Sequence, residues 1–196
     1  PGRVGRLAWV SGPVSLLADG RSEAAVLNWP LTSGQTLVTG ASGRAEIRIG
    51  SASLRLDGNT ELELVRLDDS AVQIALVQGT LMLSVRNRDW LNEIDLSTAR
   101  ARVELLAPGR YRIEADPGRT GVGTPDGLAR VLSGRMNFTV HAGELGELSG
   151  EPYPSFRRLP YRSDAIDEWA AARDRRELQQ ASERYVSPEM PGAEAL

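Results

Sequence analysis

Residues 51–69, SASLRLDGNTELELVRLDD, predict a β-strand, a tight turn and a second β-strand. Leu54 and Leu56 alternate with polar neighbours before the Asp-Gly-Asn turn, and Leu62 and Leu64 alternate in the same way after it. A period of two places alternate side chains on opposite faces of a strand, so one face is buried and the other is polar.

The cross-strand register can be tested against the charges of this stretch. If a two-residue Gly-Ser turn precedes the first strand, Ile47 faces Leu54 and Glu46 faces Arg55. If the Asp-Gly-Asn turn is a three-residue loop, Arg55 also faces Glu61. The stretch therefore predicts an ionic ladder Glu46–Arg55–Glu61, which would help to fix the register because a one-residue slip exposes every leucine.

The same alternation continues over residues 4–148, with glycine-bearing turns every 8–12 residues or so. This pattern predicts an all-β fold of short, largely antiparallel strands arranged as a sandwich, a barrel or a solenoid-like wrap. Nothing in it is typical of alternating strands and helices, which argues against a nucleotide-binding α/β fold. The glycine-rich residues 118–127, GRTGVGTPDG, are interpreted as a loop.

The C-terminal quarter departs from the strand pattern. Residues 150–162, GEPYPSFRRLPYR, contain three prolines, which predicts an extended strap across the surface of the β domain. A helix is expected over 163–186, capped by Ser163 or Asp164, with a thin apolar stripe. We therefore predict a β domain at 1–149, the strap, this helix and a flexible tail at 187–196.

Composition narrows the function classes. The chain has 196 residues, 41% of them hydrophobic and 25% charged, and a formal net charge of −3, which does not favour binding to nucleic acid. No apolar run is long enough to cross a bilayer, and any export signal is expected to have been removed. The chain has no cysteine and no lysine, which excludes thiolate and Schiff-base chemistry.

Candidate catalytic and metal-binding groups are sparse. His141 is the single histidine and stands at the end of a predicted strand. Glu61 and Glu63 share one face of a strand, which suits a charge ladder better than an acid–base pair. Four residues could supply oxygen ligands to calcium but form no calcium-loop motif: Asp57, Asn59, Asp68 and Asp69. We predict no catalytic residue, cofactor or metal.

Several motifs together resemble the FecR domain. They are VGRLAWVSGPVSLL, NWPLTSGQTLVTGASGRAEIRIGSASLRLDGNTELELVRLDD and VQIALVQGTLMLSVR, and the resemblance covers roughly residues 4–148. Further stretches are similar to a subgroup of exported FecR-domain proteins of Gram-negative bacteria. The resemblance implies a periplasmic or exported location and offers no catalytic residues. Sigma-factor control is not carried over, because neither an anti-sigma segment nor a membrane span is found in the sequence.

These observations predict a non-catalytic domain of the cell envelope that binds another protein, or assembles with it, through strand edges and the C-terminal helix. The predicted contact residues lie in the strap and the helix: Tyr153, Phe156, Arg157, Arg158, Tyr161, Trp169, Arg173 and Arg176. The alternative is a module that binds envelope glycan by stacking Trp9, Trp29 and Trp90 on sugars. An enzyme that depends on His141 is a third, weaker hypothesis.

Overall fold

The computed structural model of the protein describes residues 3–185. It contains two compact units, the first ending at Arg162 and the second beginning at Ser163. Within the first unit, seventeen strands form two layers, and neighbouring strands pair antiparallel except for one parallel pair, β9 with β10. The predicted all-β fold with a C-terminal helix is confirmed.

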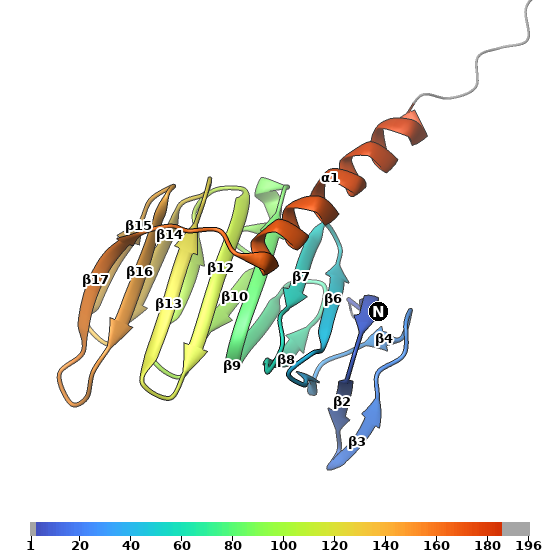
Figure 1. The fold of residues 1–196 in the computed structure, drawn as a ribbon, viewed down its shortest axis with the longest axis horizontal. Helices are drawn as coiled ribbons and strands as arrows, with labels where there is room; N and C mark the ends of the chain where they lie inside the picture. The colour runs from blue at the N-terminus through green and yellow to red at the C-terminus, as the bar shows by residue number, and fades with distance from the viewer. Residues whose placement is uncertain (1–2, 186–196) are drawn as a thin grey trace, which may run out of the picture. The chain divides into compact units, whose positions relative to one another are not determined.

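Layer A is defined here as the sheet nearer the viewer in Figure 1. Its strands follow in this spatial order: β4 (Pro30–Leu31), β1 (Gly5–Ser11), β6 (Arg44–Ile49), β7 (Ala52–Leu56), the second half of β9 (Val72–Val85), β12 (Gly109–Asp116), β13 (Arg119–Thr124), β16 (Glu144–Ser149) and β17 (Ser155–Pro160).

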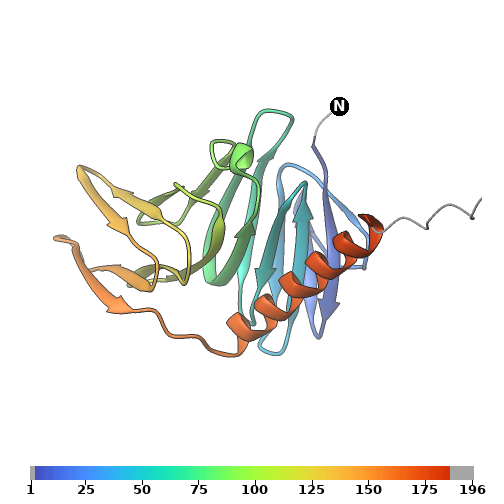
Figure 2. The ribbon, with the colours of Figure 1, turned by 90° about the horizontal axis from the view of Figure 1, so that it is seen from above.

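Layer B lies behind it. Its order is β3 (Arg21–Ala24), β2 (Val14–Ala18), β5 (Gln35–Thr39), β8 (Glu61–Leu67), the first half of β9, β10 (Ile94–Ser97), β11 (Arg102–Leu105), β14 (Ala129–Ser133) and β15 (Met136–Val140). The strands β14 to β17, yellow to orange, lie together at one end of the first unit (Figures 1 and 2). A short 3₁₀ turn, Arg88–Trp90, follows β9.

Strand β9 joins the two layers, and Gly79 is the residue at which it crosses. Gln78 pairs with Glu61 in layer B, whereas Gly79 pairs with Ala115 in layer A. Gly79 has a φ of 97°, and a Cβ there would lie 2.5 Å from the Cα of Thr60. Only glycine combines this backbone conformation with so close an approach. One apolar cluster, fed by alternate residues of both layers, fills the space between them.

The quoted stretch is only partly a hairpin. Glu46 pairs with Arg55 and Ile47 with Leu54, as predicted. The predicted pairing of Arg55 with Glu61 is wrong. β7 pairs with β9 rather than with β8, and Arg55 faces Met82. The Asp-Gly-Asn turn carries the chain from layer A to layer B, where β8 lies between β5 and β9.

Hydrogen bonds from distant residues hold this crossing. The N–H of Thr39 donates to the carbonyl of Thr60 at 2.8 Å, and the N–H of Thr60 donates to the hydroxyl of Thr39 at 2.9 Å. The N–H of Asn59 donates to Gly40 at 3.0 Å, and that of Asp57 donates to Thr80 at 3.2 Å. These bonds satisfy the backbone of the turn without a hairpin ladder.

The loop interpretation of 118–127 is wrong over its first half. Residues Arg119–Thr124 form β13, which pairs with both β12 and β16. The glycines conceal the strand pattern, but they serve packing: a Cβ on Gly123 would lie 2.8 Å from the ring of Tyr161. Glycine is therefore required where this aromatic ring crosses the strand.

The second unit contains helix α1 (Ala165–Tyr185). Asp164, one of the two predicted caps, precedes it: its N–H donates to the carboxylate of Asp167 at 3.1 Å, and the N–H of Asp167 donates to Asp164 at 3.5 Å. Among the helix residues, Ile166, Asp167 and Ala170 are buried. Over residues 3–185, no helix has the length and apolarity needed to cross a membrane. The predicted tail at 187–196 lies outside the described residues.

Candidate interaction surface

The predicted strap contains a strand. Residues Ser155–Pro160 form β17, which pairs along its whole length with β16 and ends layer A. The prolines predict an extended segment across the surface, and this extended segment pairs as a strand. The ladder is compatible with Pro160 because bonding alternates along an antiparallel pair. The N–H of Tyr161 donates to the carbonyl of Gly143 at 2.8 Å. The backbone nitrogen of the preceding residue, Pro160, therefore points away from β16, where no N–H is needed.

The three aromatic residues of the strap have different environments. Phe156 stacks on Phe138 of β15, with ring centroids 4.0 Å apart and planes 5° apart. Tyr161 is half-buried, with its ring over Gly123. Tyr153 is 88% exposed. Phe156 and Tyr161 therefore attach the strap to the β domain, and Tyr153 is the one of the three whose ring is available to a partner.

The two strap arginines reach neighbouring strands. Arg157 bonds to Glu147 of β16 at 2.7 Å, yet its side chain is 70% exposed. Arg158 pairs with Glu144 at 3.1 Å, lies over the ring of Phe156, and donates to the carbonyl of Thr139 in β15. Because Thr139 belongs to layer B, Arg158 and the stacked phenylalanines connect the ends of the two layers.

An ionic chain that the sequence pattern did not predict crosses four strands of layer A. Its members alternate in charge from β12 to β17: Arg112, Glu114, Arg119, Glu147 and Arg157. Arg119 bonds to Glu114 at 2.5 Å and to Glu147 at 2.8 Å. Period-two alternation places these residues on the polar face, but only the strand order shows that they are neighbours.

The ionic chain shifts the pKa values of two of its members, Glu147 and Arg119. Burial would raise the pKa of Glu147, but hydrogen bonds from Arg157 and Arg119 outweigh burial and hold this pKa below its ordinary value. Burial would likewise lower the pKa of Arg119, and its bonds to Glu114 and Glu147 raise it instead. Glu147 and Arg119 therefore remain charged near neutral pH.

The three predicted contact residues of α1 differ in exposure. Trp169 and Arg173 are partly exposed, one turn apart, and Arg176 is exposed. Leu178 and Tyr185 of the same helix are 55% and 91% exposed. The helix thus displays apolar and cationic side chains to solvent, as a protein-binding surface would require.

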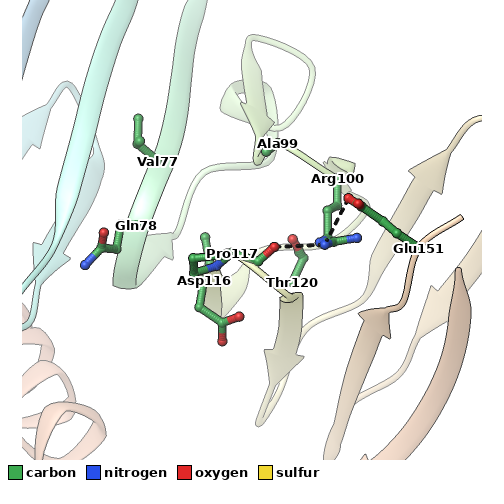
Figure 3. A pocket seen from close by; sticks show the side chains of 9 residues that line it. Val77, Gln78, Ala99, Arg100, Asp116, Pro117, Thr120 and Glu151 are labelled. Carbon is green, nitrogen blue, oxygen red and sulfur yellow. Dashed lines mark hydrogen bonds and ion pairs between the residues drawn. The ribbon is translucent and has the colours of Figure 1, made fainter.

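The pocket in Figure 3 lies among turns of the first unit, near Arg100. Its volume is about 180 Å³. Arg100 donates to the carbonyl of Pro117 at 2.9 Å and pairs with Glu151 at 3.3 Å. Thr120, also in the lining, shares a hydrogen bond with Thr98 at 2.8 Å. Arg100 thus connects the turn at Pro117 with Glu151, so we interpret this pocket as a structural junction.

The candidate chemical groups do not converge. His141 is exposed, with Nδ1 3.5 Å from the carboxylate of Glu144. Asp68 accepts hydrogen bonds from the hydroxyl and N–H of Ser70, and these bonds lower its pKa. Asp57 pairs with Arg44 at 3.3 Å. Across residues 3–185, no group of three or more histidine or carboxylate side chains is placed to hold a metal ion.

The three tryptophans of the glycan hypothesis have different surroundings. Trp9 lies on β1 and is 38% exposed. Trp90 packs against the core under the guanidinium of Arg3, 4.3 Å from its ring centroid. Trp29 also packs against the core, but it lines an open pocket of about 460 Å³ together with polar residues of β3 and its turn.

Comparison with known proteins agrees with this architecture. The sequence model of a family described as "FecR protein" matches residues 35–130. Two crystal structures, each described as "a putative anti-sigma factor" from Parabacteroides distasonis ATCC 8503, resemble the fold with TM-scores of 0.57 and 0.56. Their sequences are 11% and 10% identical to this one, so the likeness concerns the fold alone.

The structural match covers 69% of this chain but only 63% and 64% of the two related chains. This chain thus spans less than two thirds of their length. No curated protein is significantly similar in sequence. The family match includes the β6–β7 hairpin, the crossing at Gly79 and the ladder of β9 with β12. Residues 35–130 are therefore a FecR domain.

Proposed function

We propose that this chain is a non-catalytic protein-interaction domain of the cell envelope, located in the periplasm, that takes part in signalling or in an assembly. The observation that carries the proposal is the FecR domain at residues 35–130. The structural relatives support it, because an anti-sigma factor acts by binding another protein. The resemblance to exported FecR-domain proteins supports the location.

The surfaces of both units support a binding role. In the first unit, β15 and β17 end the two layers, and Tyr153, in the turn between β16 and β17, has its ring exposed. In the second unit, α1 presents Trp169 together with the cationic residues Arg173 and Arg176. Strand edges and amphipathic helices are two common means by which proteins bind a partner segment.

The experiment that tests this proposal is chemical cross-linking of the full chain in the cells that produce it, followed by mass spectrometry of the cross-linked peptides. The expected result is a recurrent protein partner joined to peptides of the β15–β17 region or of α1. A chain that cross-links only to itself, or that sediments with purified peptidoglycan, would contradict the proposal. Fractionation of the same cells tests the periplasmic location.

The glycan-binding alternative is favoured by one observation, the pocket lined by Trp29. Asp19, Arg21, Glu23 and Gln35 share this pocket, and an aromatic ring beside planar polar groups suits a sugar. Co-sedimentation with peptidoglycan that is lost in the Trp29→Ala variant would support this alternative. The matched control is Trp9→Ala, because Trp9 does not line the pocket.

A further inference from the structure

Four strands end the two layers, and three of them have features that discourage pairing with another chain. β4 is two residues long and begins with Pro30. β3 has four residues, all exposed and half of them charged. β17 carries Arg157, Arg158 and Pro160. Shortness, charge and proline are the means by which natural edge strands avoid unwanted pairing.

The fourth end strand, β15, has none of these features. Its sequence, MNFTV, contains neither charge nor proline, and within the described chain it pairs with β14 alone. Met136, Phe138 and Val140 alternate with Asn137 and Thr139. The first three are buried or half-buried, so β15 keeps the pattern of an interior strand at the border of the sheet.

The backbone of β15 directs hydrogen-bonding groups outward. The N–H of Leu106 donates to the carbonyl of Leu128 at 2.8 Å, which makes this a bonded pair of the β11–β14 ladder. Backbone hydrogen bonds form at every second residue of an antiparallel strand. Arg130, two residues after Leu128, therefore also directs its N–H and C=O to β11. Its β15 partner, Thr139, must therefore direct its own groups away from β14. The bond from Arg158 to the Thr139 carbonyl agrees with this direction.

The β14–β15 hairpin carries charge of one sign, although carboxylates of neighbouring strands pair with two arginines at this edge: Glu104 with Arg130 at 3.4 Å and Glu144 with Arg158 at 3.1 Å. The β14–β15 hairpin, residues 129–140, contains Arg130 and Arg135 and no acidic residue. Arg135 is exposed in the turn. Arg158 reaches the edge from β17 with a side chain that is 44% exposed. An incoming strand would therefore meet outward N–H and C=O groups flanked by guanidinium groups, which favours carboxylates on that strand.

We propose that β15 is a docking strand that accepts an extended, acidic segment of another protein by strand addition. This inference rests on the proposed function and names its binding edge and the chemistry of its partner. Apolar residues at alternate positions of the segment lie beside Phe138, and its carboxylates lie towards Arg135 and Arg158. The outward N–H of Thr139 and the outward groups of Asn137 provide the backbone bonds, and the Thr139 carbonyl already accepts a hydrogen bond from Arg158.

Charge argues for a different protein rather than a second copy of this chain. Pairing two copies through β15 would bring together two hairpins that carry Arg130 and Arg135 and no acidic residue. Like charges close together across a strand pair destabilise it. An acidic partner removes this repulsion, so the occupant is predicted to be an acidic segment of another protein.

A binding assay with synthetic peptides tests the proposal on the full chain. One fluorescein-labelled peptide contains alternating valine and glutamate, and its matched control has arginine in place of glutamate. Fluorescence anisotropy should give an affinity for the acidic peptide at least tenfold higher than for the basic one. The Thr139→Pro variant should lose at least tenfold in affinity, because proline removes an outward N–H.

Matched variants separate this effect from loss of structure. Thr139→Val keeps the N–H and the branched shape, so it should bind within twofold of the unchanged protein. Thr139→Pro should keep the circular dichroism spectrum, because the N–H that it removes does not bond to β14. If the Thr139→Pro variant unfolds, the Arg135→Glu variant in the exposed turn provides the test. Its affinity for the acidic peptide should be at least threefold lower than that of the unchanged protein.

Three results would overturn the proposal: equal affinity for the two peptides, full binding by folded Thr139→Pro, or a dimer that Thr139→Pro abolishes in sedimentation analysis. Cross-linking in cells separates this failure from failure of the proposed function. A partner that cross-links equally to the unchanged protein and to the Thr139→Pro variant would refute the role of β15 as a docking strand. It would leave the proposed protein-interaction function intact. Absence of any partner for the unchanged protein would refute the interaction role itself.

Discussion

Arg55 of β7 bonds to Glu46 of β6 through Nε and Oε1 at 2.7 Å, and both side chains are fully buried. Arg55 also donates to the hydroxyl of Ser84 at 3.2 Å. Removing one member of a buried ion pair leaves an unpaired buried charge. We therefore expect Glu46→Ala to lower the free energy of unfolding by about 3 kcal/mol in urea titrations.

Glu61 is the control for this substitution, since the sequence pattern placed it in the same ladder. It lies in layer B opposite Val38 and Gln78, and Glu61→Ala should cost less than about 0.5 kcal/mol. Equal costs for the two substitutions would contradict the strand order described above.

Gly50 combines a positive φ of 57° with a close approach to an aromatic ring. A Cβ at this position would lie 1.9 Å from Cζ2 of Trp90, so Gly50→Ala must displace the indole from the core. We expect a loss of about 3 kcal/mol in thermal unfolding. Gly20 has a φ of 73° with nothing nearby, and Gly20→Ala should cost about 1 kcal/mol. Similar losses at both sites would show that backbone conformation alone matters.

The lowered pKa of Glu147 predicts that acid reduces the stability of layer A at its β17 end. Its pKa is lowered in the folded protein from an ordinary value of 4.5, so the stability it contributes is present above that pH. That contribution is lost as the pH falls through the folded pKa. Glu147→Gln should therefore cost about 1–2 kcal/mol at neutral pH and progressively less below about pH 4.5. A cost that grows with acidification would contradict this account.

Trp169 tests whether α1 contributes to binding. Trp169 is partly exposed, so Trp169→Ala should weaken capture of the cross-linked partner at least tenfold and lower the melting temperature by only about 2–4 °C. Gln179→Ala, on an exposed part of the same helix, should change neither quantity. A large fall in melting temperature with unchanged capture would identify Trp169 as a core residue.

The sequence predicted local structure well and long-range connections poorly. The register of Glu46 with Arg55 follows from a two-residue turn, and the cap at Asp164 follows from its position before the helix. The turn after Leu56 was wrong because Leu62 and Leu64 alternate equally well in a hairpin or in the opposite layer. The bonds that decide between these two arrangements come from Thr39 and Thr80, both remote in sequence.

The arrangement of the strap residues could not be predicted from the sequence. The strap residues do lie at one end of the β domain, but the stack of Phe156 on Phe138 and the bond of Arg158 to Thr139 depend on which strands end each layer. Strand order also creates the ionic chain through Arg119 and the exposed edge of β15. A single sequence contains the alternation of MNFTV, but it does not show which side of that strand remains unpaired.

The central claim is that this protein works by binding another protein, and site-specific photocrosslinking in living cells tests it most directly. A benzoylphenylalanine residue is placed in turn at Asn137, Tyr153 and Arg176, with Val65 on β8 as the control. The account predicts a discrete adduct with one other protein from at least one of the first three positions and none from Val65. The absence of any protein adduct, or adducts with glycan alone, would contradict it.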